Sequence, residues 1–329
     1  MLRGDEQPEL VVLCSDRDDR PPGMGPVEER MRVQYTDAAR LAEAVRLADA
    51  LLLWDFFSTA LHDVWSVQQR LRWVHVAAAG VDKLLFADLR ESDVVVTNAR
   101  GIFDRPIAEF VLASILAHAK DVHRSHDLQR ARRWRHRETL PVTGRRVLVV
   151  GTGAIGRETA RLLGAVGMEV WGAGRSARED DADFARVVAS SQLAAHIGGF
   201  DYVVVVAPLT DRTRGLVDAR ILSAMRPSSY LVNVGRGATV VEDDLCSALR
   251  SGQIAGAALD VFEREPLSPE DPLWTVPGLV ITAHMSGDAV GWRDALVEQF
   301  VTNALRWVDG KPLENVVDKR LGFVPASVP

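Results

Sequence analysis

Residues 147–163 read V-L-V-V-G-T-G-A-I-G-R-E-T-A-R-L-L, and this stretch decides the fold. Its four leading apolar residues predict a buried strand that ends at Gly151, and the apolar positions from Ile155 to Val166 then change to helical spacing. The glycines of a G-x-G-x-x-G turn have separate tasks: the first makes the turn, the second lets backbone approach a pyrophosphate, and the third lets the helix pack on the strand. Because a helix N-terminus attracts phosphate, the stretch favours a dinucleotide-binding turn over a plain glycine-bearing loop. The residues expected to contact the dinucleotide are Gly151, Gly153, Ala154, Ile155 and Gly156.

Length, composition and charge limit the class of protein. With 329 residues the chain has room for two domains with separate cores, and 47% hydrophobic with 26% charged residues is typical of a soluble globular protein. The net charge of -6 argues against a general binder of nucleic acid or acidic membranes. The two cysteines, Cys14 and Cys246, lie far apart and indicate a reducing compartment. The acidic start has no apolar targeting region, and no apolar run is long enough to span a membrane, so we expect a cytoplasmic protein.

Apolar runs alternate with helical patterns along the chain, which is typical of parallel sheets covered by helices. The fold class is therefore expected to be α/β, with two Rossmann-like or flavodoxin-like parallel-sheet domains and a cleft between them. We expect residues 1–99 and 288–329 to form a discontinuous substrate (catalytic) domain, and residues 100–287 to form an NAD(P)-binding Rossmann domain. A helix over 106–128 is expected to connect the domains, and a helix over 288–308 to return the chain to the first. Strands are predicted at 10–14, 32–35, 50–54, 73–76 and 94–97, and then at 147–150, 169–172, 202–206, 230–234, 257–259 and 279–282.

A dense basic run occupies residues 124–137, where five arginines surround Trp134. In an acidic protein, we interpret this run as a solvated arm or a subunit contact rather than a phosphate-binding surface. His118, His123 and His126 lie nearby at partly helical spacing, but without Cys or Glu at ligand spacing we interpret them as surface histidines rather than a metal site.

The residues after the second Rossmann strand bear on the choice of nicotinamide nucleotide. An enzyme that uses NAD usually has Asp or Glu there, which holds the ribose hydroxyls. Here residues 172–178 read G-A-G-R-S-A-R, so Arg175, Ser176 and Arg178 offer positive charge and a hydroxyl where a carboxylate would repel a 2′-phosphate. We therefore expect NADP(H) to be preferred, with NAD(H) left open. The alternative is an exposed loop with ordinary arginines.

Three charged or titratable residues stand at or near the ends of later strands. They are Arg236 in V-N-V-G-R-G, Glu265 in L-D-V-F-E-R-E-P-L and His284 in I-T-A-H-M-S-G-D. An open α/β sheet binds its ligand at the carboxyl ends of its strands, so all three can face one crevice. An Arg fork suits a carboxylate and a carbonyl, a His exchanges a proton near neutral pH, and a Glu stabilises the protonated imidazole. Taken singly, each has an alternative as a surface ion or a cap.

With these residues in place, the chain resembles the D-isomer-specific 2-hydroxyacid dehydrogenase family over residues 73–318. W-D-F-F at 54–57 and the Arg-Ser pair after the second strand are most similar to its glyoxylate/hydroxypyruvate reductase branch. The matching motifs are A-A-A-G-V-D at 77–82, A-E-F-V-L-A at 108–113, G-T-G-A-I-G at 151–156, A-P-L-T-D-R-T at 207–213, N-V-G-R-G at 233–237, A-A-L-D-V-F-E-R-E-P-L at 257–267 and D-P-L-W at 271–274.

The resemblance implies a role for each matching residue. It makes Arg236 the ligand of the substrate carboxylate and carbonyl, His284 the acid/base, and Glu265 its partner. It also implies that Ala79 and Gly80 offer backbone N–H groups to the carboxylate, that Asp260 contacts the nicotinamide amide, and that a long arm makes homodimers. The further contacts that we assign by this resemblance are Trp54 for substrate and Ala207, Pro208, Thr213 and Val234 for cofactor. One departure is M-S-G-D-A-V-G-W at 285–292, which replaces the family's commoner small-residue run.

We therefore expect an NADPH-preferring reductase of small 2-keto acids such as glyoxylate or hydroxypyruvate, with no metal and no nucleic-acid or membrane partner. Because protonated His284 gives the proton, reduction should fall as rising pH deprotonates it. Bulky residues near the proposed crevice either fill it for glyoxylate or form the wall of a pocket for larger keto acids; they are Trp54, Phe56, Phe57, Phe103, Met285 and Trp292. Two other functions stay open: an NAD(H)-sensing, corepressor-like binding protein, and an NAD-dependent formate- or phosphite-type dehydrogenase.

Overall fold

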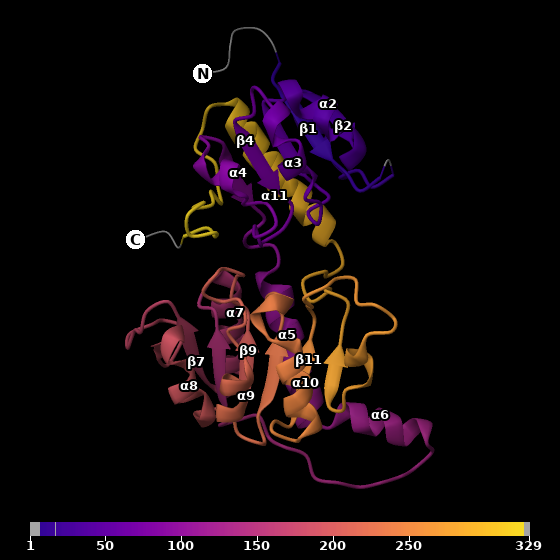
Figure 1. Cartoon of the computed structure of the whole chain (residues 1–329), viewed down its shortest axis with the longest axis vertical. Helices are drawn as coiled ribbons and strands as arrows, with labels where there is room; N and C mark the ends of the chain where they lie inside the picture. The colour runs from indigo at the N-terminus through magenta and orange to yellow at the C-terminus, as the bar shows by residue number, and fades with distance from the viewer. Residues whose placement is uncertain (1–6, 17, 326–329) are drawn as a thin grey trace. The chain divides into compact units, whose positions relative to one another are not determined.

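The computed structural model describes residues 7–16 and 18–325, which form two compact units. One unit combines Met1–Phe103 with Val290–Pro329, and the other is the continuous stretch Asp104–Ala289. We expected the divisions after residues 99 and 287. The observed divisions fall a few residues later, after Phe103 and Ala289. In Figure 1 the indigo strands from the start of the chain and the yellow helix α11 (Trp292–Val308) belong to the same unit. In the described part of the chain, no helix is both long enough and apolar enough to cross a membrane.

The first unit is built on a five-stranded parallel sheet in the order β2-β1-β3-β4-β5. Its strands are β1 (Glu9–Leu13), β2 (Arg32–Thr36), β3 (Ala50–Leu53), β4 (Trp73–Val76) and β5 (Val95–Asn98). All residues of β3 and β4 are buried, as expected of strands covered on both faces. Its helices are α1 (Gly25–Glu28), α2 (Leu41–Ala44), α3 (Ala60–Asp63), α4 (Ala87–Glu91) and α11. Helix α11 packs on β4, where the ring of Phe300 stacks on that of Trp73 with their centroids 5.5 Å apart.

The second unit contains a seven-stranded parallel sheet in the order β12-β11-β10-β9-β6-β7-β8. Its strands are β6 (Arg146–Val150), β7 (Glu169–Gly174), β8 (Val187–Ala189), β9 (Tyr202–Val205), β10 (Tyr230–Asn233), β11 (Gly256–Leu259) and β12 (Leu279–Ile281). Its helices are α5 (Asp104–Ala119), α6 (Val122–Arg130), α7 (Ala154–Ala165), α8 (Leu193–His196), α9 (Ala219–Ala224) and α10 (Glu242–Arg250). The strand order reverses between β6 and β9, which is where doubly wound sheets bind ligands. The predicted α/β class is confirmed; only the short strand β8 was not predicted.

The prediction of one helix over 106–128 is wrong, because the structure has α5 and α6 with a break at Asp121. Asp121 adopts a left-handed backbone conformation with φ of 53°. Arg137 stabilises this break, since its Nη2 donates to the carbonyl oxygen of Asp121 at 2.8 Å and its Nε donates to the carboxylate. Asp tolerates the left-handed region better than most residues, so the break needs neither Gly nor Pro to mark it in the sequence.

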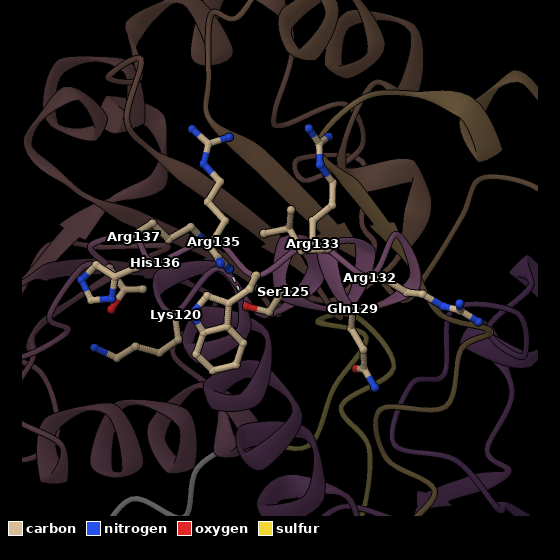
Figure 2. A pocket seen from close by; sticks show the side chains of 11 residues that line it. Lys120, Ser125, Gln129, Arg132, Arg133, Arg135, His136 and Arg137 are labelled. Carbon is tan, nitrogen blue, oxygen red and sulfur yellow. Dashed lines mark hydrogen bonds between the residues drawn. The ribbon is translucent and has the colours of Figure 1, made fainter.

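After α6 the chain continues as a segment without regular secondary structure. We call this segment, residues 131–143, the basic arm. The side chain of Trp134, at its middle, is fully exposed. The arm and α6 line an open pocket of about 620 Å³, and Figure 2 shows the guanidinium groups of Arg133 and Arg135 extending to one side of it. In the region that the structure describes, no group of three or more His, Cys, Asp or Glu is arranged to hold a metal. His118 instead stacks on Tyr230, with ring centroids 4.1 Å apart.

His75 is a fully buried histidine in β4 of the first unit. Thr97 Oγ1 accepts a hydrogen bond from Trp73 Nε1 at 2.9 Å and forms a second hydrogen bond with His75 Nδ1 at 2.8 Å. The other ring nitrogen, Nε2, is buried and has no hydrogen-bond partner among the described residues. Burial lowers the pKa of His75 to about 3. The imidazole is therefore neutral in the folded protein.

We predict that this histidine makes the protein sensitive to acid. Because its pKa is lower in the folded than in the unfolded chain, the unfolded chain binds more protons below pH 6.5, and stability is lost as pH falls from about 6.5 toward about 3. Between pH 7.5 and pH 5 this effect costs on the order of 2 kcal/mol of unfolding free energy. Urea unfolding of wild type and His75→Leu at both pH values measures it, and the variant should lack this part of the loss. The exposed His62→Leu is the matched control, and an equal pH dependence in all three proteins would contradict the prediction.

Candidate active site

The glycine turn between β6 and α7 has the shape that a dinucleotide requires. Gly151 has φ of 114°, and a Cβ on it would lie 2.7 Å from the Ala207 nitrogen. A Cβ on Gly156 would lie 1.9 Å from the Gly151 carbonyl oxygen, so this glycine lets α7 pack against the turn. A Cβ on Gly153 would meet nothing within 4 Å. Two glycines therefore allow close packing, and the third borders open space where a pyrophosphate can approach the backbone.

The N-terminus of α7 is suited to bind phosphate. The helix spans twelve residues from Ala154, and within the described residues no side chain hydrogen-bonds to its N-terminal turn at Gly153. Backbone N–H groups of a first helical turn have no partner inside the helix, so those of Ala154 and Ile155 suit an anion. The residues present thus fit the phosphates of a nicotinamide nucleotide.

The loop after β9 carries three predicted cofactor contacts. Ala207 is buried against the glycine turn, as the contact with Gly151 requires. The hydroxyl of Thr213 donates to the Pro208 carbonyl at 2.6 Å and accepts from the Thr210 N–H at 2.8 Å. Thr213 therefore holds the shape of this loop. Val234, the fourth predicted contact of this kind, is buried directly after β10.

The predicted 2′-phosphate residues follow β7 and differ in their surroundings. Arg175 and Ser176 are exposed. Arg178 forms an ion pair with Asp181, 3.0 Å apart, and its Nη2 lies 3.5 Å from Thr152 Oγ1 in the glycine turn. Arg178 is thus held by a carboxylate, and its charge is offset. Arg175 is the more exposed of the two arginines.

Asp181 was not predicted from the sequence. Its side chain is 4% exposed and also pairs with Arg157 at 2.8 Å. Burial tends to raise the pKa of Asp181, but hydrogen bonds from Arg157, the Asp183 N–H and Arg178 outweigh burial and lower it to about 2. The Arg-x-x-Asp spacing of Arg178 and Asp181 could have indicated this ion pair from the sequence, because a carboxylate three residues away can reach an arginine in a turn.

Arg236 lies in the loop after β10, and its backbone is held on both sides. Its carbonyl oxygen accepts from Asn233 Nδ2 at 3.1 Å and from Thr239 Oγ1 at 2.6 Å. A Cβ on the next residue, Gly237, would lie 1.9 Å from the carbonyl carbon of Phe262. The Arg236 loop therefore packs directly against the segment that leads to Glu265.

Glu265 and His284 come together, although 19 residues separate them. His284 Nδ1 lies 2.7 Å from Glu265 Oε2, and Glu265 Oε1 accepts from the Phe262 N–H at 2.9 Å. Both side chains are partly exposed, 32% for His284 and 20% for Glu265. With Nδ1 facing the carboxylate, proton exchange with a substrate would take place at Nε2. Asp288 is also close, and burial raises the pKa of its carboxyl, opposed by the charge of His284.

The backbone at His284 is unusual. Its φ is 50°, in the left-handed region, which non-glycine residues seldom adopt. Asp260 lies beneath this turn and is fully buried, with hydrogen bonds from Met285 and Ser286 to its carboxylate. The predicted contact of Asp260 with nicotinamide stays a prediction.

The predicted substrate residues of the first unit lie in loops after its strands. Trp54, directly after β3, is 4% exposed and has the Arg293 guanidinium 4.8 Å above its ring. Ala79 and Gly80 lie partly exposed after β4, and the Ala79 carbonyl accepts from Asn98 Nδ2. Aromatic residues of the same unit pack on one another: Phe56 lies 4.6 Å from Phe57 and 6.3 Å from Trp292, and Phe103 lies 6.2 Å from Trp292, between ring centroids.

Comparisons with known proteins show which proteins this chain is similar to. A family model described as D-isomer specific 2-hydroxyacid dehydrogenase, NAD binding domain, matches residues 112–286. The chain is 29% identical over 284 residues to glyoxylate/hydroxypyruvate reductase A of Serratia proteamaculans. The aligned region covers 84% of this chain and 88% of that protein.

Solved structures of similar proteins cover almost the whole chain. One is a D-isomer specific 2-hydroxyacid dehydrogenase from Xanthobacter autotrophicus in complex with NADPH and MES, with 31% identity, a TM-score of 0.80, and 97% of this chain and 100% of that chain covered. Another is an NADPH-dependent glyoxylate/hydroxypyruvate reductase from Sinorhizobium meliloti in complex with NADP and sulfate, with 29% identity, a TM-score of 0.79 and the same coverage.

Proposed function

This chain belongs to the D-isomer specific 2-hydroxyacid dehydrogenase family, and from this premise we propose that it reduces a small 2-keto acid, such as glyoxylate or hydroxypyruvate, with NADPH. Membership makes it an NAD(P)-dependent oxidoreductase. The observation that carries the proposal is the Glu265–His284 pair, 2.7 Å apart, in loops at the carboxyl end of the sheet that also bears the glycine turn. A proton donor beside a nucleotide site is what carbonyl reduction requires.

In the proposed reaction, Arg236 binds the substrate carboxylate and stabilises the negative charge that grows on the carbonyl oxygen. The nicotinamide nucleotide supplies the hydride that the carbonyl carbon accepts. His284 transfers its Nε2 proton to the carbonyl oxygen, so that the C=O group becomes CH–OH. Glu265 lies beside Nδ1 and fixes the orientation of the ring, which leaves Nε2 for the substrate. Substrate contacts of Trp54, Ala79 and Gly80 are part of the proposal on the basis of the family resemblance alone.

A panel of 2-keto acids, each tested with NADPH and with NADH, tests this function. We expect NADPH oxidation, followed by its absorbance, with glyoxylate or hydroxypyruvate as the acceptor. Larger keto acids in the same panel show whether the aromatic cluster around Phe56 and Trp292 leaves room for a larger substrate side chain. Absence of turnover with every keto acid and both nucleotides would refute the proposal.

NADP(H) is the proposed cofactor because Arg175 and Ser176 follow β7, and two of the similar structures hold NADP or NADPH. Replacing Arg175 by alanine removes a cation from the proposed 2′-phosphate site. A hydrogen bond between charged groups is worth roughly 1.5–3 kcal/mol, so KM for NADPH should rise about 10-fold to 100-fold while KM for NADH stays within about threefold. Steady-state kinetics with each nucleotide measures both values.

Arg186→Ala is the matched control for Arg175→Ala. Arg186 belongs to the same segment between β7 and β8, and it pairs with Glu179 at 2.6 Å. Its loss should change the two KM values alike. Equal losses for NADPH and NADH in Arg175→Ala itself would remove the 2′-phosphate argument.

We also propose that the basic arm joins two copies of the chain into a homodimer. The arm presents Trp134 fully exposed among arginines, while the chain as a whole carries a net charge of -6. An exposed tryptophan is a common centre of a protein interface, and a basic arm complements an acidic partner. A second copy of the chain satisfies both conditions.

Trp134→Ala should therefore weaken the dimer. A central interface tryptophan contributes about 2–4 kcal/mol, so the dimer dissociation constant should rise at least about thirtyfold. Sedimentation velocity over a range of concentrations measures this constant. Trp274→Ala, at a half-exposed tryptophan of the same unit, is the control and should leave the dimer intact. A wild-type protein that sediments as a monomer throughout would contradict the homodimer.

A further inference from the structure

Asp260 forms several hydrogen bonds with the loop that carries His284. It follows β11 directly and is fully buried. Its Oδ1 accepts from the Thr282 hydroxyl at 2.6 Å and from the Met285 N–H at 3.0 Å, and its Oδ2 accepts from the Ser286 N–H at 2.9 Å. Its backbone carbonyl accepts from the His284 N–H at 2.8 Å. One buried residue thus holds four groups on both sides of the histidine.

These hydrogen bonds explain how His284 keeps its left-handed backbone. A φ of 50° is rare for a residue with a Cβ and persists only where the surroundings impose it. Thr282 is bound before the turn, and Met285 and Ser286 are bound after it. The path of the chain between these points is therefore short and fixed, and it directs His284 Nδ1 toward Glu265 Oε2 at 2.7 Å.

The same residue is tied to the Arg236 loop. The Asp260 N–H donates to the Asn233 carbonyl at 3.0 Å, and Asn233 is also fully buried. Asn233 Oδ1 accepts from the Gly235 N–H at 3.1 Å, and its Nδ2 donates to the Arg236 carbonyl at 3.1 Å. Asn233 ends β10 and Asp260 directly follows the neighbouring strand β11, and each holds the loop that comes after its strand.

We infer that Asp260 is a positioning residue for the reaction, which acts through His284 by imposing the left-handed turn that brings the imidazole to Glu265. The inference rests on the proposed function of His284 as proton donor. It assigns the three hydrogen bonds on the Asp260 carboxylate to catalysis, in addition to the predicted contact with nicotinamide. A small displacement of a catalytic group lowers turnover strongly without changing how the nucleotide binds.

Asp260→Asn tests the inference, because asparagine keeps the size of the side chain but one end of its amide cannot accept a hydrogen bond. We expect kcat to fall on the order of 10²-fold. The Kd for NADPH, measured by fluorescence without keto acid, should stay within about threefold, since the phosphates bind elsewhere. Asp218→Asn is the matched control: Asp218 is a carboxylate that accepts from the Ile221 N–H at 2.9 Å at the start of α9 in the same unit. Its kcat should remain at the wild-type level.

A spectroscopic readout makes the test independent of turnover. The ¹⁵N imidazole signals of the eight histidines report which ring nitrogen carries the proton, and His284→Gln assigns the signal of His284. At a pH high enough to keep the imidazole neutral, we expect the single proton of the wild-type ring on Nδ1, facing Glu265, and in Asp260→Asn we expect a mixture of tautomers. Asp218→Asn should give the wild-type spectrum. If no keto acid is reduced even by wild type, the proposed function fails, while this comparison still decides whether Asp260 positions the ring.

Thr282→Val covers the case in which Asp260→Asn does not fold. It removes one hydrogen bond, at 2.6 Å, and leaves the carboxylate in place. We expect a smaller fall in kcat, about 3-fold to 10-fold, with the same direction of change in the His284 signal. An unchanged His284 signal in the folded variants would overturn the inference, and so would a loss of NADPH binding as large as the loss in kcat, which would make the contact with nicotinamide the main role of Asp260.

Discussion

His284→Gln should lower kcat for 2-keto acid reduction on the order of 10³-fold, the largest effect that we expect from any single substitution. Glutamine keeps polar atoms at this position but cannot give a proton to the carbonyl oxygen, and general acid catalysis contributes about 10²-fold to 10⁴-fold. The Kd for NADPH should not change, because the glycine turn that fits the phosphates lies on other loops. Single-turnover reduction of glyoxylate at saturating NADPH measures the chemical step directly.

His196→Gln is the control for this prediction. His196 ends α8 in the same unit, far along the chain from the Glu265–His284 pair. Its removal should leave kcat at the wild-type value. Turnover of His284→Gln within about tenfold of wild type would show that another group supplies the proton, and the mechanism would have to be abandoned.

Arg236→Ala is expected to cost a hundredfold or more in kcat/KM. A donor aimed at a developing oxyanion is worth about 3–4 kcal/mol, and this arginine is also proposed to hold the substrate carboxylate. The loss should therefore divide between a higher KM for the keto acid and a lower kcat. Initial rates over a range of glyoxylate concentrations separate the two contributions.

Lysine should restore little of this loss, because it lacks the planar fork that binds a carboxylate and a carbonyl together. Arg236→Lys is expected to stay at least about tenfold below wild type, since one of two parallel hydrogen bonds is missing. Arg250→Ala, at an exposed arginine that ends α10, is the control and should behave as wild type. Full activity in Arg236→Lys would mean that only the charge matters.

The sheets were predictable because most of their strands are runs of buried apolar residues. Strand β4 has the bounds that its apolar residues predict, and the three glycines stand at the turn that their spacing implies. The break at Asp121 was not predictable, since it depends on Arg137, which lies outside the helix. Strand β8 is too short to give a pattern.

The candidate site was also predictable only in part. The chemical types at positions 236, 265 and 284 suggested a set, and the structure places Glu265 and His284 at hydrogen-bond distance. The buried carboxylates of Asp181 and Asp260 gave weaker signals, because their function depends on partners from other loops. An aspartate in a sequence does not show whether it will meet water, a ligand or the backbone.

The order in which the two units become complete follows from the path of the chain. All residues of the second unit, Asp104–Ala289, are synthesised before those of α11. Until then Trp73 lacks both Phe300 and Trp307, whose rings lie 5.5 and 5.9 Å from it in the finished protein. The nascent first unit therefore exposes an aromatic strand during synthesis, which makes it the part of the protein that chaperones should engage.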